Sequence, residues 1–351
     1  MKKGIIIVPF MTGFGGTETV IKNLFKERKK NRVKYKLSVY SLGGSIDYSW
    51  AADVPLKVKW ISKSRLIRRL YYLLGMPLNL FYYLKKERPD FVISTNPVIW
   101  FLTRIILPKS VPVIAWYHYS LAQKPIKKVF LYSADFYLAI SSGIKRQLEN
   151  AGISSNKIFT IYNPVVSEGN IVKRPVNEVR FVYLGRLNLD GQKNLRELID
   201  ALNNVKGNWT LDLYGDQSDA QKLKEYVSAK KIEQHIIWHG FINNPWENME
   251  SATALLLTSK YEGLPMVLCE AISHGVYCIS ANTETGPDDI INDCNGELYQ
   301  LGNTTELCSI LQEVVNGSKL PSQKGIVLSA EKFNAHNYLR RFDQVIDKIL
   351  G

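Results

Sequence analysis

The stretch YEGLPMVLCEAISHG, residues 261–275, decides how the second half of this chain folds and indicates its ligand. Glu262 and Glu270 stand eight residues apart around a Gly-Leu-Pro turn. Gly263 lets the backbone come close to a ligand, and Pro265 suits the first turn of a following helix. The start of that helix offers free N–H groups and a positive dipole end, which favour a phosphate. Because carboxylates accept hydrogen bonds from diols, the pattern indicates a sugar linked through phosphate to a nucleoside.

Outward from this stretch, short apolar runs alternate with helical patterns, which predicts parallel sheets with helices on both faces. The predicted strands are 4–9, 36–41, 90–95, 111–116, 136–140, 179–184, 209–214, 235–239, 253–257 and 277–281. The predicted helices are 17–30, 65–87, 123–133, 143–152, 193–204, 218–231, 265–275 and 334–349. We therefore expect an α/β protein of two doubly wound, Rossmann-like domains around a central cleft, where ligands bind beyond the carboxyl ends of strands.

A polar stretch with two prolines, PVVSEGNIVKRPVNE, begins at Pro164 and is typical of a linker. We therefore predict domains at 1–165 and 166–330. The segment 331–351 holds the last helix, which we expect to pack back toward the first domain.

Composition and charge narrow the class of protein. The chain has 351 residues, 46% of them hydrophobic, which is enough for two cored domains. It contains no apolar run of membrane-spanning length, and its start, MKKGIIIVPF, predicts a buried strand and not a signal peptide. The four cysteines have neither metal-ligand nor paired spacing, which favours a reducing, cytoplasmic location.

The net charge of +13 is unevenly distributed. Residues 1–165 hold 27 Lys or Arg against 8 Asp or Glu, a balance of +19. Residues 166–351 hold 18 against 24, a balance of −6. The basic half is expected to face an anionic membrane surface or an anionic acceptor. We expect no nucleic-acid partner, because no nucleic-acid module is recognisable.

Two loops at strand ends are candidates for binding a phosphorylated sugar. In MTGFGGTE, residues 11–18, Gly15 and Gly16 allow a phosphate or sugar to approach the backbone, although a tight turn without a ligand explains the glycines equally well. In YLGRLNLDGQKN, residues 183–194, Arg186 and Lys193 can face one diphosphate and stabilise its charge as it departs. The alternative is a solvated basic loop, which we disfavour because the loop follows a strand.

Histidines and acidic residues elsewhere in the chain are weaker candidates for a functional site. His118 in WYHYS follows an apolar strand and can hydrogen-bond to a reacting sugar, but a satisfied core histidine is the alternative. His239 is assigned to that structural class. In TETGPDDII, Asp288 and Asp289 open a short helix and are expected to stabilise its dipole, with Thr285 available near a phosphate.

Together these motifs resemble the family-four glycosyltransferases, the large retaining group with the GT-B fold. The matching pieces are GFGGTE, AISSGIKRQLENAGI with IYNPV, YLGRL with QKNLRELIDAL, and LLLTSKYEGLPMVLCEAISHG. The later run YCISANTETGPDDIINDCNGELY, with NPW at 244–246, is similar to the lipopolysaccharide 1,6-galactosyltransferase branch.

The resemblance implies a role for each candidate residue. Glu262 would hold the donor sugar, Glu270 the ribose diol, and Arg186 with Lys193 the diphosphate. His118 would contact the sugar near the reacting carbon. Further donor contacts are implied for Gly15, Gly16, Phe241, Ile242, Gly263, Leu264, Pro265, Met266 and Val267. The resemblance also implies retention of anomeric configuration and a reaction without metal or other cofactor.

Two positions depart from common family patterns. YGDQ at 214–217 lacks the second glycine that is usual in the family, so the nucleobase pocket is expected to differ. Tyr119 follows His118 at a position where many relatives carry an acidic residue. Contacts close to the sugar are therefore expected to differ.

The segment 62–90 places Lys63, Arg65, Arg68 and Arg69 beside tyrosines, leucines and Phe81. Basic residues beside aromatics on a helix suit an anionic membrane surface, and an ordinary domain helix is the alternative.

We therefore expect a peripheral enzyme at the inner face of the cell membrane. It would move a hexose, best matched by galactose from UDP-galactose, to a lipid-linked or lipopolysaccharide-type glycan. UDP-glucose, UDP-N-acetylglucosamine, GDP-mannose and a protein acceptor stay open. The rival is a non-catalytic glycan-binding subunit, which would be expected to lose donor-site residues that are present here.

Overall fold

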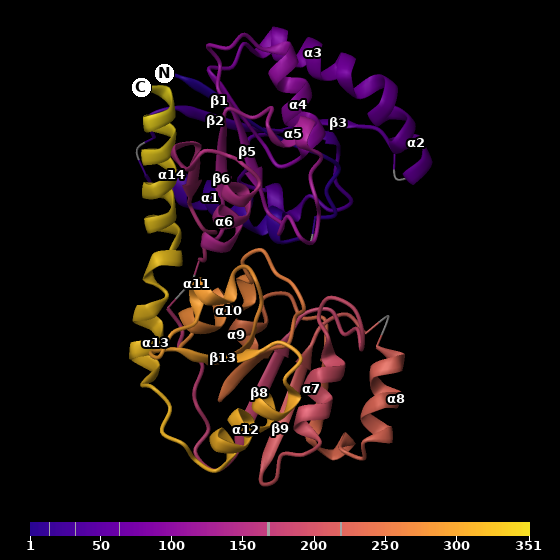
Figure 1. Cartoon of the computed structure of the whole chain (residues 1–351), viewed down its shortest axis with the longest axis vertical. Helices are drawn as coiled ribbons and strands as arrows, with labels where there is room; N and C mark the ends of the chain where they lie inside the picture. Colours follow the sequence, from indigo (N-terminus) through magenta and orange to yellow (C-terminus); the bar gives the residue numbers. More distant parts are fainter. Residues whose placement is uncertain (14, 32, 63, 167–168, 218–219) are drawn as a thin grey trace. The chain divides into compact units, whose positions relative to one another are not determined.

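The computed structural model describes residues 1–13, 15–31, 33–62, 64–166, 169–217 and 220–351. It divides into two compact units, each built around a parallel sheet with helices on both faces (Figure 1). Unit 1 is Met1–Val166 with Ala335–Gly351, and unit 2 is Ser167–Asn334. The predicted α/β class is therefore confirmed.

Unit 1 contains a seven-stranded sheet whose order reverses between its first and fourth strands. The strands in spatial order are β3 (Leu56–Trp60), β2 (Lys36–Gly43), β1 (Lys3–Val8), β4 (Phe91–Ser94), β5 (Val113–Tyr117), β6 (Phe136–Ala139) and β7 (Ile158–Thr160). Every residue of β4 and β5 is buried. Central strands covered on both faces are therefore nearly continuous apolar runs, which is why the sequence predicted them.

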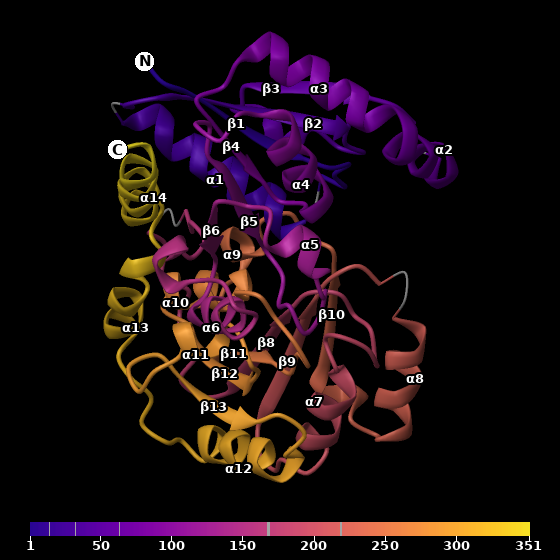
Figure 2. The ribbon, with the colours of Figure 1, turned by 45° about the horizontal axis from the view of Figure 1, so that its top comes forward.

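The helices of unit 1 are α1 (Gly16–Lys30), α2 (Arg65–Leu70), α3 (Met76–Glu87), α4 (Pro97–Ile106), α5 (Lys128–Leu131), α6 (Ser142–Asn150) and α14 (Ala335–Leu350). α3 and α4 pack on one face of the sheet, where Met76, Leu80 and Ile99 join a core with Ile5 and Ile7 of β1. α14 packs against α1 (Figure 2), and Asp343 on α14 accepts a hydrogen bond from Arg28 on α1 at 3.2 Å. The last helix thus belongs to unit 1, although 168 residues of unit 2 precede it in the chain.

Unit 2 has six parallel strands with the same kind of reversal. The spatial order is β10 (Ile236–Gly240), β9 (Trp209–Tyr214), β8 (Val179–Leu184), β11 (Ala254–Leu257), β12 (Tyr277–Asn282) and β13 (Gly296–Gln300). The helices are α7 (Leu195–Leu202), α8 (Gln221–Ala229), α9 (Pro245–Asn248), α10 (Met266–Ser273), α11 (Pro287–Ile290), α12 (Thr304–Val315) and α13 (Gln323–Ser329). In Figures 1 and 2, α7 and α8 lie on one side of the sheet and α10 on the other.

Several elements differ from the sequence prediction. Strands β3, β7 and β13 and helices α4, α9, α12 and α13 were not predicted, and the helix predicted at 123–133 is only Lys128–Leu131. β3 is an edge strand with four exposed residues, so it lacks an apolar run. α4 reads PVIWFLTRII, and its first seven residues include one polar side chain, Thr103, so the sequence shows no alternation of apolar and polar residues with a helical period.

The helix predicted at 65–87 is interrupted by a π-helical turn, Tyr71–Gly75, between α2 and α3. Tyr72 in this turn fixes the segment to the sheet. Its hydroxyl accepts from the Phe10 amide and donates to the Leu42 carbonyl, both at 2.8 Å. Lys63, which the sequence analysis placed with this segment, lies outside the described residues.

Candidate active site

The carboxyl ends of β8 and β11 lie side by side, at the point where the strand order of the second sheet reverses. The loop after β8 supplies Lys193, and the loop after β11 supplies Glu262. The Lys193 Nζ lies 2.7 Å from Glu262 Oε1, and the two side chains are 15% and 10% exposed. Ligands of doubly wound sheets bind at this kind of reversal. The structure therefore brings together two residues, 69 positions apart, that the sequence analysis assigned to one ligand.

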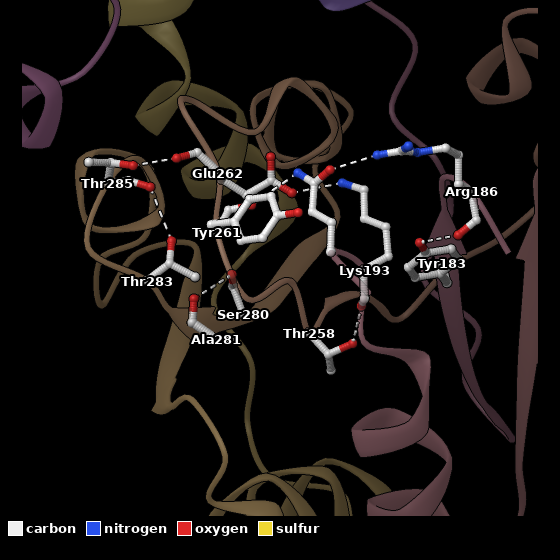
Figure 3. Close-up of polar contacts among 11 residues, drawn as sticks. Tyr183, Arg186, Lys193, Thr258, Tyr261, Glu262, Ser280, Ala281, Thr283 and Thr285 are labelled. Carbon is white, nitrogen blue, oxygen red and sulfur yellow. Dashed lines mark hydrogen bonds and ion pairs between the residues drawn. The ribbon is translucent and has the colours of Figure 1, made fainter. Parts of the chain in front are cut away.

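Arg186 is held beside this ion pair by a chain of hydrogen bonds (Figure 3). Its guanidinium donates to Gln192 Oε1 at 2.6 Å, and the Gln192 amide donates to the Tyr261 carbonyl at 3.0 Å. Arg186 is exposed, so its charge is available to a ligand. Sequence reasoning missed Gln192, whose only signal was its place in the same polar loop.

Buried hydroxyl groups fix the backbone under the pair (Figure 3). Thr258, at the end of β11, donates to the carbonyl oxygens of Lys193 at 3.0 Å and Asn194 at 3.1 Å. Thr285 donates to the Glu262 carbonyl. Gly286 has φ of 101°, and a side chain there would meet the Gly263 carbonyl oxygen at 2.8 Å. Thr285 therefore braces the glutamate loop, a role that the sequence analysis did not assign to it.

Helix α10 begins at Met266, with Pro265 as its N-cap. The sequence predicts Pro265 as the first residue of this helix, which starts one residue later than predicted. The backbone from Gly263 to Val267 thus forms the approach to a helix N-terminus, where unbonded N–H groups favour an anion. Leu264 is buried within this turn and supports it.

Glu270 lies on α10, one turn before the helix end. Its carboxylate accepts a hydrogen bond from the indole N–H of Trp246 at 3.2 Å. Desolvation by burial raises its pKa to about 7, and the Trp246 bond opposes that rise only partly. A carboxylate with such a pKa is typical of functional sites.

The loop after β10 carries Phe241 and Ile242, the residues expected near the nucleobase. Phe241 is 68% exposed and Ile242 is partly buried. The nearby His239 bonds through Nε2 to Asp212 and stacks on Tyr214 with ring centroids 4.2 Å apart. His239 therefore has partners within the sheet, as its structural assignment predicted.

In unit 1, Gly15, Gly16 and His118 line one cavity of about 450 Å³. The cavity lies at the carboxyl ends of β1, β4 and β5, and its other walls include Phe10, Asn96, Tyr119 and Lys124. The Glu18 carboxylate shapes the glycine loop, since it accepts from the amides of Thr12 and Gly13, both at 3.0 Å. The unit 1 candidates thus share a site that can hold a sugar.

His118 is neutral at physiological pH, because burial lowers its pKa to about 3. Its Nε2 is buried and has no hydrogen-bond partner within the described part of the chain. The ring lies 4.7 Å from that of Trp116. The ring lines the cavity, and a neutral imidazole can donate or accept one hydrogen bond at a sugar hydroxyl.

The site in unit 2 thus unites Arg186, Lys193 and Glu262, with Glu270 on the helix that follows. Gly15, Gly16 and His118 form a separate group in unit 1. Within the described ranges, no group of three or more His, Cys, Asp or Glu side chains is arranged to hold a metal ion. Asp288 and Asp289 lie in the first turn of α11, where acids stabilise the helix dipole.

Comparison with known proteins assigns the family. Residues 14–168 match the domain family Glycosyltransferase Family 4, and residues 168–325 match Glycosyl transferases group 1. The lipopolysaccharide 1,6-galactosyltransferase of Escherichia coli K12 is 34% identical over 348 residues, which cover 96% of this chain and 95% of that protein. This chain belongs to glycosyltransferase family 4.

Other relatives agree with this placement. The lipopolysaccharide 1,6-galactosyltransferase of Salmonella typhimurium LT2 is also 34% identical, over 96% of both chains. The solved apo structure of the lipopolysaccharide outer core galactosyltransferase WaaB matches this family 4 glycosyltransferase with a TM-score of 0.86 and 33% identity, over 99% of this chain and 100% of the other. Anabaena HepE in complex with UDP shares the fold at a TM-score of 0.80 and 17% identity, over 99% and 100% of the two chains. The predicted GT-B fold and family are therefore confirmed.

Proposed function

We propose that this glycosyltransferase moves galactose from UDP-galactose to a sugar hydroxyl of a lipopolysaccharide-type glycan. The observation that carries the proposal is the Lys193–Glu262 pair at the strand reversal of unit 2, in a chain that is 34% identical to two lipopolysaccharide 1,6-galactosyltransferases. Glu262 can accept hydrogen bonds from sugar hydroxyls, and Lys193 can bind the diphosphate.

The donor contacts proposed for unit 2 follow the order of groups in a nucleotide sugar. Arg186, Lys193 and the N-terminus of α10 bind the diphosphate, where their charges stabilise the departing UDP. Glu270 accepts hydrogen bonds from the ribose diol. Phe241 and Ile242 flank the base, and the backbone of Gly263, Leu264, Pro265, Met266 and Val267 lines the sugar and diphosphate. Within unit 1, Gly15, Gly16 and His118 are proposed to contact a sugar in the cavity that they line.

We propose retention of anomeric configuration by front-face attack. The bond between the anomeric carbon and the β-phosphate oxygen breaks, and the acceptor oxygen bonds to the same face of that carbon. The acceptor proton passes to the departing phosphate oxygen, so no side chain has to act as a base. Lys193 and Arg186 supply the charge stabilisation that a divalent metal gives elsewhere, and we expect transfer to persist in excess EDTA.

The donor and its base are tested by a thermal-shift screen against UDP, GDP, ADP and their common sugar conjugates, without added metal. Binding raises the melting temperature in proportion to ln(1 + [L]/Kd), so UDP and UDP-galactose should give the largest rises. If GDP-mannose, UDP-glucose or UDP-N-acetylglucosamine gave the largest rise instead, that nucleotide sugar would take the place of UDP-galactose as the proposed donor. No response to any nucleotide would favour a non-catalytic glycan-binding subunit. Transfer to galactose-free lipopolysaccharide core, with proton NMR of the new linkage, then tests acceptor and retention.

The pKa of Glu270 gives a pH dependence to nucleotide binding. A diol donates to a carboxylate, so UDP binds the ionised form, and that form becomes populated as pH rises through about 7. UDP affinity should therefore rise about tenfold between pH 6 and 8, as follows from a pKa near 7. Calorimetric titrations of the wild type and Glu270→Gln would check this. The variant should keep only the smaller dependence that comes from the phosphate itself. An equal dependence in both proteins would contradict the role of Glu270.

We also propose that unit 1 lies on the inner face of the cell membrane through α2, the π-helical turn and α3. Large apolar side chains are exposed there, with Leu66 at 67%, Leu73 and Leu74 at 74% and Tyr82 at 69%. Arg65, Arg69, Lys85 and Lys86 lie on the same segment. Apolar side chains flanked by cations suit an anionic membrane surface. None of the helices in the described ranges is long and apolar enough to span a membrane.

Replacing Leu73 and Leu74 by serine should lower binding to phosphatidylglycerol-containing vesicles about 30-fold. Each leucine contributes roughly 1 kcal/mol when half of its side chain is buried, and 1.4 kcal/mol corresponds to tenfold. Flotation at low salt measures the bound fraction. Leu328→Ser is the matched control, because Leu328 is a 65% exposed leucine of unit 2. Equal flotation of the wild type and the double variant would contradict membrane contact by this segment.

A further inference from the structure

Trp246 is the one side chain that hydrogen-bonds to Glu270 in the described part of unit 2, and neither the fold nor the donor contacts above assign it a role. Its indole N–H donates to Glu270 Oε2 at 3.2 Å. Trp246 is 4% exposed, whereas its neighbours Glu247 and Asn248 are exposed. The tryptophan is therefore directed inward from a short surface helix, α9.

The backbone before Trp246 fixes that inward direction. Asn244 adopts a left-handed conformation with φ of 55°, and Pro245 is the first residue of α9. A proline at this position restricts φ to about −65°. The turn therefore sets the position of the indole before any ligand arrives.

The indole also contacts the C-cap residue of α10, His274. It stacks on the ring of His274, with centroids 5.3 Å apart and planes 11° from parallel. Glu270 and His274 are four residues apart on one helical segment, so they face the same side. His274 Nδ1 bonds in turn to the Asn170 carbonyl at 2.6 Å. Trp246 is thus held by stacking while its N–H is directed at the carboxylate.

We propose that Trp246 is a positioning residue for nucleotide recognition, which holds the Glu270 carboxylate in the orientation that accepts the ribose diol. This inference rests on the proposed binding of the ribose by Glu270. The indole N–H bonds to one lone pair of Oε2, which leaves Oε1 and the remaining lone pair of Oε2 to accept hydrogen bonds from two ribose hydroxyls. A carboxylate fixed in this way loses less rotamer freedom when the ligand binds.

A purely structural role is the alternative, in which Glu270 serves only as the acceptor that a buried indole requires. The two roles differ in ligand preference. A positioned carboxylate favours UDP over 2′,3′-dideoxy-UDP, which lacks both ribose hydroxyls. If Trp246 positions the carboxylate, its replacement reduces the preference for UDP over 2′,3′-dideoxy-UDP. If Trp246 only packs in the core, its replacement lowers the stability of the fold and leaves that preference unchanged.

The test compares Trp246→Phe with Trp209→Phe. Trp209 is also buried in unit 2, its indole donates at 3.2 Å to the Val205 carbonyl, and it stacks on His235 with centroids 4.2 Å apart. The two variants therefore lose the same kind of bond and contact, and only Trp246 contacts Glu270. Glu270→Ala defines the preference that remains without the carboxylate. Dissociation constants for UDP and 2′,3′-dideoxy-UDP are measured by calorimetry on the full chain.

Trp246→Phe should reduce the preference for UDP by about five- to tenfold, as expected for the loss of one ordinary hydrogen bond. Trp209→Phe should keep the wild-type preference. If Trp246→Phe keeps that preference while Glu270→Ala loses it, the positioning role is wrong and the ribose assignment stands. If the wild type has no preference, or does not bind UDP, both the ribose assignment and the positioning role are overturned.

Discussion

Replacing Lys193 by alanine should lower galactosyl transfer by about 10²- to 10³-fold. The Lys193 ammonium lies 2.7 Å from the Glu262 carboxylate at the strand reversal of unit 2, and the Lys193 side chain is only 15% exposed. The ammonium is therefore directed into the site before the donor binds. Removing one group aimed at the charge that develops in a transition state typically costs this much. UDP affinity should fall as well, because a charge-assisted hydrogen bond contributes about 1.5–3 kcal/mol. Initial rates with UDP-galactose and calorimetric UDP binding measure the two effects.

Loss of Lys193 also leaves the largely buried Glu262 carboxylate without its partner, which lowers stability. Rates should therefore be measured well below the melting temperature of each variant. Lys230→Ala is the matched control, since Lys230 pairs with Asp200 at 2.7 Å elsewhere in unit 2. It should transfer at the wild-type rate. Near-normal turnover in folded Lys193→Ala would show that the diphosphate binds elsewhere.

Glu262→Gln should lower transfer about 10²-fold, because it removes a contact to the donor sugar and not to the diphosphate. Glu262 is assigned to the donor sugar, and a site that hydrogen-bonds to sugar hydroxyls depends strongly on those bonds. UDP without a sugar should bind the variant as tightly as the wild type or more tightly, because Lys193 no longer shares its charge with a carboxylate. The measurement compares dissociation constants for UDP and UDP-galactose with the transfer rate.

Glu313→Gln, on the exposed side of α12, controls for loss of a negative charge in unit 2 and should have no effect. The contrast between UDP and UDP-galactose separates the two assignments. Weaker binding of UDP itself in Glu262→Gln would place the glutamate at the diphosphate and not at the sugar. Unchanged transfer would remove Glu262 from the active site.

Buried parallel strands could be predicted because both of their faces are covered. β1, β8 and β11 are short apolar runs, and the runs at 4–9, 179–184 and 253–257 predicted them to within one or two residues. Edge strand β3 was missed because lysines alternate along it, with side chains in solvent. The π-helical turn at Tyr71–Gly75 was missed because it changes backbone bonding without changing the apolar pattern.

The sequence likewise predicted some features of the candidate site and not others. Local spacing placed Glu262, Lys193 and Arg186 on loops after strands, but it could not say which of them touch. The ion pair depends on β8 and β11 being neighbours in the sheet, although β9 and β10 lie between them in sequence. The Trp246–Glu270 bond likewise spans 24 residues, and NPW at 244–246 indicated only a subfamily.

By itself, the sequence determined the α/β class, the family and the residue types available for a nucleotide sugar. Those depend on local periodicity and on short motifs, since strand burial and helix caps act over a few residues. The tertiary structure alone decided which charges meet and how far burial raises the pKa of Glu270. These properties depend on the order of strands and on burial by distant segments, which no local stretch of sequence specifies.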